Sequence, residues 1–295
     1  MKNIIWVLFA AALLMTACAD ETTDVEKTEE DTTEQEKTEE STADTSDAKQ
    51  NESEDEEKAS GQSDKGETVQ ENISEPEYKI DENDSSVVPI SEKGNEKAVL
   101  LTIDDVPDGH ALNMAKTLKD LDAGAIFFVN GHFLETSEDK ETVQQIHDMG
   151  FAIGNHTYNH ELLPDLSTEE QEEEIVSLSD TIEDIIGERP QFFRAPHGAN
   201  TDFTKQLVED EGMVLMNWTY GYDYFEPYMD AEKLTEAMVT GKGPEADVPH
   251  SLLKPGANLL MHDREWTAEA LEDIVIGLRD KGYEIVDPEL IQTVN

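Results

Sequence analysis

Short apolar runs alternate with segments of helical spacing from about residue 97 to the end of the chain. Such continuous apolar runs are typical of strands that are buried on both faces, and their repeated alternation with helices predicts a parallel sheet covered by helices. The expected strands are 98–103, 125–129, 151–153, 192–193, 213–216, 258–261 and 283–286. The clearest helical patterns are 111–121, 141–149 and 168–186, the last with Ser167 or Thr168 as its N-cap.

This α/β pattern leaves two arrangements open, a barrel and an open doubly wound sheet. Roughly 200 residues are available, which is close to the lower limit for a barrel of eight strand-helix units. We therefore expect residues 97–295 to form an irregular, incomplete (β/α) barrel.

The part of the chain before this domain has a different composition. Residues 19–75 consist mainly of Glu, Thr, Ser, Asp and Lys, so they cannot bury enough apolar surface to offset the entropy of ordering. We expect a disordered acidic tether there. Residues 76–96 form a transitional segment whose apolar side chains are candidates to dock on the edge of the domain. These side chains are Tyr78, Ile80, Val87, Val88 and Ile90.

The N-terminus has the pattern of an export signal. Lys2 precedes an apolar run, Ile4 to Leu14, that is too short to span a bilayer as a stable helix. Small residues then precede Cys18, which resembles a bacterial lipoprotein signal over residues 1–18. The resemblance implies that Cys18 is lipidated and that the protein is extracytoplasmic and anchored to the bacterial cell membrane. An ordinary signal peptide with an incidental cysteine is the alternative.

Charge and cysteine content exclude several functions. The chain has 21 Lys and Arg against 69 Asp and Glu, a formal net charge of −48. Nucleic acid is therefore not an expected partner, because phosphate binding needs a basic face. Cys18 is the single cysteine, so an intramolecular disulfide and a multi-cysteine metal site are also excluded.

Polar residues gather directly after the expected strands. In a parallel barrel those strand ends converge on one face, where catalytic sites lie. The residues concerned are Asp104, Asp105, His156 to His160, Arg194 to Gly198, Asp223 and His262.

Two of these groups suggest a metal site. His156 and His160 are four residues apart, so a turn can direct both imidazoles at one point, and one carboxylate would complete a three-ligand site with a position open for water. Asp104 and Asp105 are sequential and should diverge on a strand, so that one binds metal while the other points to the water. A turn or a helix N-cap is the alternative for this pair. Arg194 lies in an apolar setting and needs a carboxylate partner.

The order of these motifs resembles carbohydrate esterase family 4, the polysaccharide deacetylases with a NodB homology domain. The similarity covers about residues 97–290. Five segments carry it: Leu101 to Asp105 (Thr-Phe-Asp-Asp-Gly in the family), the strand Ala125 to Gly131, His156 to His160 (His-Ser/Thr-x-x-His), Arg194 to Gly198 (Arg-x-Pro-x-Gly) and Leu260 to His262 (Leu-x-His).

The resemblance implies both an activity and a role for each residue. The expected reaction is hydrolytic N-deacetylation of N-acetylated sugars in peptidoglycan, a chitin-like polymer or an exopolysaccharide, with release of acetate. One divalent metal ion is implied, zinc first, with cobalt, nickel or manganese as alternatives. The resemblance implies that the metal ligands are Asp105, His156 and His160. It implies that Asp104, paired with Arg194, is the general base and that His262, oriented by Asp223, is the general acid. The backbone N–H of His197 is implied to bind the oxyanion.

Two other functions stay open, a surface lipoprotein that binds glycan without turnover and an O-acetyl esterase acting on xylan. The sequence departs from the family pattern at Ile103, which replaces Phe, at Val106, which replaces Gly, and at Tyr224, which replaces Trp. A positive φ at Val106 would strain a β-branched residue. Aromatic residues near strand ends are candidates for sugar stacking, although core packing is the commoner role: Trp218, Tyr220, Tyr222, Tyr224 and Trp266.

The remaining predictions concern the other histidines and the assembly. Four histidines outside the motifs are expected to be caps, partly buried polar groups or surface groups: His110, His132, His147 and His250. The expected partners are a polysaccharide substrate and, through the lipid anchor, a membrane. We expect a monomer.

Overall fold

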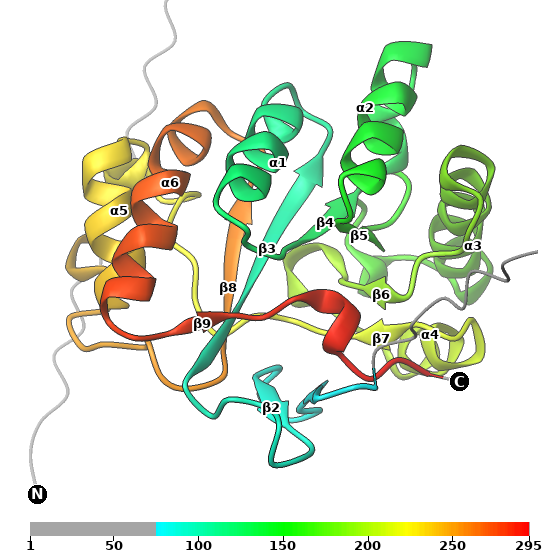
Figure 1. The fold of residues 1–295 in the computed structure, drawn as a ribbon. Helices are drawn as coiled ribbons and strands as arrows, with labels where there is room; N and C mark the ends of the chain where they lie inside the picture. Colours follow the sequence, from blue (N-terminus) through cyan, green and yellow to red (C-terminus); the bar gives the residue numbers. More distant parts are fainter. Residues whose placement is uncertain (1–74, 295) are drawn as a thin grey trace, which may run out of the picture. The chain divides into compact units, whose positions relative to one another are not determined.

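The computed structural model describes residues 75–294, so the predicted signal sequence, the lipidation of Cys18 and the tether over 19–74 lie outside the described residues. One parallel sheet organises this part of the chain (Figure 1). Its strands are β3 (Ala98–Val106), β4 (Ile126–Val129), β5 (Ala152–Asn155), β6 (Phe192–Phe193), β7 (Val214–Leu215), β8 (Ala257–His262) and β9 (Glu284–Ile285).

The sheet curls into an incomplete barrel, as the sequence predicted. Its order is β7-β6-β5-β4-β3-β8, and β9 pairs with the first residues of β3. The two outer strands, β7 and β8, do not pair with each other. Only a bridge between Tyr220 and Leu259 spans part of the gap. The barrel is therefore open between β7 and β8.

Six helices connect these strands and cover the outer face of the sheet (Figure 1). They are α1 (Ala111–Asp120), α2 (Ser137–Asp148), α3 (Thr168–Ile186), α4 (Asp202–Asp210), α5 (Ala231–Thr240) and α6 (Glu265–Asp280). Within 75–294 no helix combines the length and the apolar character that crossing a membrane requires.

Local signals set the helix starts. Ser167 caps α3 as predicted, and its capping box uses Glu170. The helix predicted at 141–149 begins earlier, at Ser137, because Thr136 and Asp139 form a second capping box that apolar periodicity does not reveal.

The alternation of side chains along β3 explains how the fold builds a site. Val99, Leu101 and Ile103 pack in the core beneath the helices, whereas Leu100 faces the barrel interior. Thr102 lies on the interior side as well, because it contacts buried Arg194 there. Strand β3 thus contributes apolar Leu100 low in the interior and polar side chains toward its carboxyl end.

The transitional segment forms a small antiparallel hairpin, β1 (Tyr78–Ile80) and β2 (Val87–Pro89). Tyr78, Ile80 and Val87 are buried and pack with Leu100 and other interior residues, so these three dock as suggested. Ile90 does not dock, since its side chain is 41% exposed. The hairpin closes the end of the interior opposite the strand ends that carry the site.

Candidate metal centre and catalytic site

The predicted site residues converge at the carboxyl ends of the strands. Asp104 and Asp105 end β3, His156 follows β5, Arg194 follows β6, and His262 ends β8. All of them except Arg194 line a cavity of about 520 Å³. Its lining residues are Asp104, Asp105, His156, His160, His197, Trp218, Asp223, Tyr224, Met229, Leu260, His262, Arg264 and Trp266.

The expectation that Asp104 and Asp105 diverge was wrong. Asp105 has a φ of 61°, and the pairing of β3 with β4 shifts register between Ile103 and Val106. This left-handed residue breaks the strand alternation, so both carboxylates approach the same imidazole. The Nε2 atom of His156 is 3.6 Å from Asp104 Oδ2 and 3.8 Å from Asp105 Oδ1.

The same geometry resolves the question raised by Val106. Its backbone is not among those with positive φ in the described residues, because the left-handed position falls on Asp105. The Val106 side chain is fully buried in the core beneath the helices. Valine therefore fits this position, and the backbone strain that a positive φ would cause does not arise.

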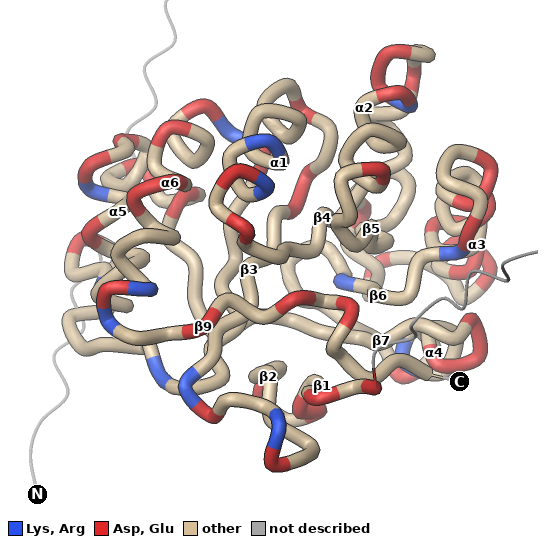
Figure 2. Tube along the Cα trace, viewed as in Figure 1, with Lys and Arg blue, Asp and Glu red and all other residues tan. Residues whose placement is uncertain are grey.

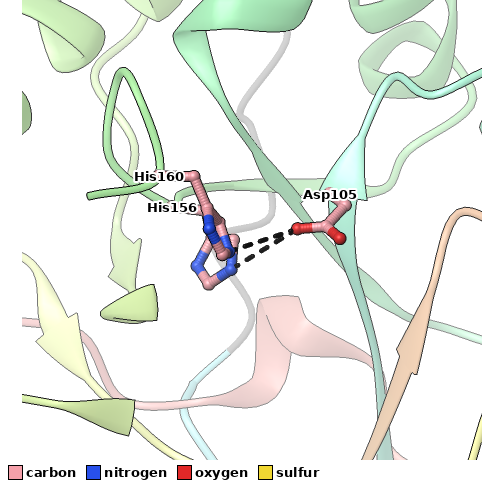
Figure 3. Close-up of side chains that lie close together, drawn as sticks. All are labelled: Asp105, His156 and His160. Carbon is pink, nitrogen blue, oxygen red and sulfur yellow. Dashed lines mark ion pairs between the residues drawn. The ribbon is translucent and has the colours of Figure 1, made fainter. Parts of the chain in front are cut away.

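Asp105, His156 and His160 form a cluster of three potential metal ligands (Figure 3). One donor atom from each residue lies within 4.8 Å of the others, and Asp105 Oδ1 is 3.5 Å from His160 Nε2. Tetrahedral zinc with bonds of about 2.0–2.1 Å would separate its ligand atoms by roughly 3.3 Å. The separations in the structure are thus close to those that such an ion needs.

The electrostatic state of the two histidines also suits a metal. Burial lowers the pKa of His156. Burial, together with the neighbouring His156, lowers the pKa of His160 to about 4. Both rings are therefore neutral near pH 7. His156 Nδ1 lies 2.7 Å from the carbonyl oxygen of Arg194, which assigns the proton to Nδ1 and leaves the Nε2 lone pair facing the cluster.

Helix α3 holds the loop that carries these histidines. Its buried Glu174 accepts hydrogen bonds from the backbone N–H of Asn159 at 2.7 Å and from the Asn159 amide at 2.6 Å. The Glu174 carbonyl accepts from the Tyr158 N–H at 2.9 Å. The loop is therefore anchored between His156 and His160.

Asp104 has the arginine partner that the sequence predicted. Arg194 is completely buried, and its Nη1 donates to Asp104 Oδ1 at 2.7 Å. The guanidinium also donates to Thr102 Oγ1 at 2.8 Å and to the carbonyl of Asn217 at 2.8 Å, and it stacks over Phe128. Asp104 thus has one oxygen fixed by Arg194, while the other faces the metal ligands.

His262 lies beside Asp104 on the neighbouring strand and is held by Asp223. The two strands pair Asp104 with His262, and His262 Nδ1 is 2.8 Å from Asp223 Oδ1. Burial lowers the pKa of His262, but the charge and hydrogen bond of Asp223, with smaller contributions from Asp104 and Asp105, outweigh it and raise the pKa to about 9. His262 is therefore protonated near pH 7.

Of His197 and the five aromatic residues named as candidates for sugar stacking, some line the cavity and others are buried in the core. His197 lies at the cavity with a φ of 57°, and its ring packs edge-on against His160 with centroids 5.2 Å apart. Trp218, Tyr224 and Trp266 line the cavity, whereas the side chains of Tyr220 and Tyr222 are buried in the core. Only the first three can meet a ligand.

Sequence reasoning missed several contributors. Arg264 donates to Asp105 Oδ2 at 2.8 Å, and Thr267 donates to Asp223 Oδ2 at 2.9 Å. Asn258 faces Arg194 from β8, at 3.3 Å. One signal could have found Arg264, because it immediately precedes α6, where an acceptor side chain is the usual choice.

The comparisons with known proteins cover part of the chain that forms this site. Residues 91–216 match the family model described as polysaccharide deacetylase, a range that contains Asp104 to His197 but not Asp223 or His262. The chain is 30% identical over 203 residues to the peptidoglycan-N-acetylmuramic acid deacetylase PdaC of Bacillus subtilis, covering 68% of this chain and 40% of that protein. It is 28% identical over 192 residues to the peptidoglycan-N-acetylglucosamine deacetylase PgdA of Listeria monocytogenes, covering 64% and 38%.

A solved structure shares the fold. The carbohydrate esterase family 4 pseudoenzyme from Bacillus anthracis matches with a TM-score of 0.56 and 26% identity over 66% of this chain and 64% of that chain. A mutant of that pseudoenzyme is described as having restored enzymatic activity. This chain spans about two fifths of the length of the two curated relatives. The chain is therefore similar to the polysaccharide deacetylase family over residues 91–216, and it shares the fold of the solved structures.

Proposed function

We propose that this protein is a metal-dependent hydrolase that removes acetyl groups from N-acetylated sugars of a polysaccharide. One observation carries the proposal. Three potential metal ligands lie beside the carboxylate of Asp104 and the protonated imidazole of His262, and a carboxylate and an imidazole are the pair of proton-transfer groups that amide hydrolysis needs. The similarity to the polysaccharide deacetylase family and the relatives named as peptidoglycan deacetylases support it.

Asp105, His156 and His160 would hold the metal ion. When bound, a divalent cation supplies a Lewis acid that lowers the pKa of water and polarises a carbonyl group. Asp104 then takes a proton from the attacking water through Oδ2, the oxygen that faces the cluster. Arg194 keeps the other oxygen fixed, so the carboxylate is oriented before the substrate arrives.

His262 would complete the reaction from the other side of the cavity. Its Nδ1 donates to Asp223, which leaves the protonated Nε2 free to give its proton to the departing sugar nitrogen. The resemblance assigns the oxyanion to the backbone N–H of His197, and His197 is one of the residues that line the cavity. Water adds to the amide carbon, the C–N bond breaks, and acetate and a free amine result.

An acetate-release assay tests this function. With zinc, cobalt, nickel or manganese supplied in turn, the full chain should release acetate from N-acetylglucosamine oligomers or peptidoglycan, and chelation should abolish the release. Asp104→Asn and His262→Ala should each lower kcat by about 10²–10⁴-fold, while thermal unfolding shows an intact fold. Asp202→Asn, at an exposed position on α4, is the control.

The outcome also separates the alternatives. Full activity in either site variant would overturn the assigned roles. A metal-loaded protein that binds the oligomers without releasing acetate would indicate a glycan-binding protein. Release from acetylated xylan alone would indicate an O-acetyl esterase.

We further propose that Cys18 anchors the protein to the outer face of a bacterial membrane. The support is the residue pattern that precedes it. In a bacterial host the full chain should partition into the detergent phase, and Cys18→Ser should move it to the aqueous phase. Identical partitioning of both forms would contradict the anchor.

A further inference from the structure

Arg264 contacts the carboxylate of Asp105, one of the three potential metal ligands, on the side away from the histidines. Its Nη2 donates to Asp105 Oδ2 at 2.8 Å, whereas Oδ1 of the same carboxylate lies 3.5 Å from His160 Nε2. The second guanidinium nitrogen, Nη1, donates to Asp108 and to the Asp263 carbonyl. The two oxygens of Asp105 therefore have separate partners, one cationic and one facing the ligands.

Arg264 makes these contacts from a position that does not favour an arginine. It occupies the N-cap of α6, and its side chain makes no capping hydrogen bond. A positive charge there opposes the helix dipole, and an arginine cannot accept from the free N–H groups of the first turn. The Arg264 side chain is stabilised instead by its contacts with the end of β3 and the loop that follows it.

A second contact joins the same two loops. The buried carboxylate of Asp263 accepts hydrogen bonds from the backbone N–H groups of Asp108 and His110, the latter at 2.7 Å. Two residues that follow β8 thus hold the end of β3 and the loop after it. Asp263 binds backbone N–H groups of that loop, and Arg264 binds the carboxylates of Asp105 and Asp108. Asp105, in its left-handed conformation, lies at one end of the segment that they hold.

We propose that Arg264 is a positioning residue of the metal centre, an inference that rests on the proposed metal-dependent function. It holds Asp105 so that only Oδ1 is presented to the ion, which keeps the remaining coordination positions open for water and substrate. Without the guanidinium, the Asp105 carboxylate is no longer held in place before the ion binds, which weakens binding, and Oδ2 is free to turn toward the ion. The carboxylates of Asp105 and Asp108 also lose the positive charge of Arg264, which offsets the repulsion between them.

Metal titration of the full chain tests this inference without relying on activity. Arg264→Gln should bind zinc about 10–100-fold more weakly in competition with a chromophoric chelator, the range for lost partners of metal ligands. Its cobalt form should show weaker visible absorption, because a second carboxylate oxygen raises the coordination number. Arg264→Lys, which keeps the charge but not the fork, should fall between the two proteins in both measurements.

Arg189→Gln is the matched control, because Arg189 likewise pairs with more than one carboxylate, those of Asp180, Glu183 and Glu211, but does not line the cavity. It should bind zinc like the unaltered protein. Unchanged zinc affinity and an unchanged cobalt spectrum in Arg264→Gln would overturn the positioning role alone. Failure of the unaltered protein to bind any divalent metal would overturn the proposed function and this inference with it.

Discussion

At the scale of single residues, the site is built from unusual backbone conformations. Seven non-glycine residues in the described part have positive φ, and four of them carry or flank the site: Asp105, Thr157, His160 and His197. Left-handed backbone is costly for residues with a Cβ, so packing elsewhere must support it. The strain places side chains where a regular strand or helix would direct them away from the cavity.

His262 leads to a prediction about pH. Its pKa of about 9 lies above the usual 6.5, so the acid form persists through neutral pH and is lost as the pH rises through the folded value. We expect kcat/KM to fall on the basic side at or somewhat below pH 9, since a bound cation nearby would lower this pKa. Asp223→Asn should move that limb to lower pH and reduce kcat.

The measurement is the pH profile of acetate release for the unaltered protein, Asp223→Asn and the exposed Asp202→Asn. Thermal unfolding should accompany it, because Asp223 also accepts from Thr267 and from the His262 backbone. An unchanged basic limb in a folded Asp223→Asn would show that His262 does not set it.

At the scale of elements, the helices outside the sheet position the loops within the site. Helix α3 supports the histidine loop through Glu174, and the segment that begins α6 supports Asp105 and Asp223. None of the three potential metal ligands lies on these helices. Each therefore acts through the side chains that it orients.

The anchoring role of α3 can be tested at Glu174. Glu174→Gln would turn an amide donor toward the donors of Asn159, so we expect a loss of about 2 kcal/mol in the free energy of unfolding and several-fold weaker zinc binding. Glu173→Gln, at the exposed neighbouring position, is the control and should change neither quantity. Equal zinc affinity in the two variants would refute the anchoring role.

At the scale of the whole molecule, the charge of the domain should govern which polymers approach. Acidic residues are spread over the surface helices, with few basic residues between them (Figure 2). The negative field repels polyanions over about one Debye length, roughly 30 Å at 0.01 M salt and 3 Å at 1 M. A neutral or weakly charged glycan should therefore be the better substrate at low ionic strength.

This expectation can be checked with two acetylated oligomers that differ only in added carboxylates. The ratio of kcat/KM for the neutral oligomer to that for the anionic one should be large at low salt and should approach a constant as salt is raised. A ratio independent of salt would show that long-range charge does not select the substrate.

The sequence alone determined the repeated strand-helix pattern, the incomplete barrel and the residues at the strand ends, because periodicity and spacing along the chain encode them. Only the tertiary structure decided how those residues meet. The left-handed turn at Asp105, the hairpin beneath the barrel, and the contacts of Arg264, Thr267 and Asn258 depend on segments far apart in sequence. The strand-end pattern predicted that these residues gather on one face, but it could not specify which atoms come into contact there, because those contacts depend on how distant segments pack against one another.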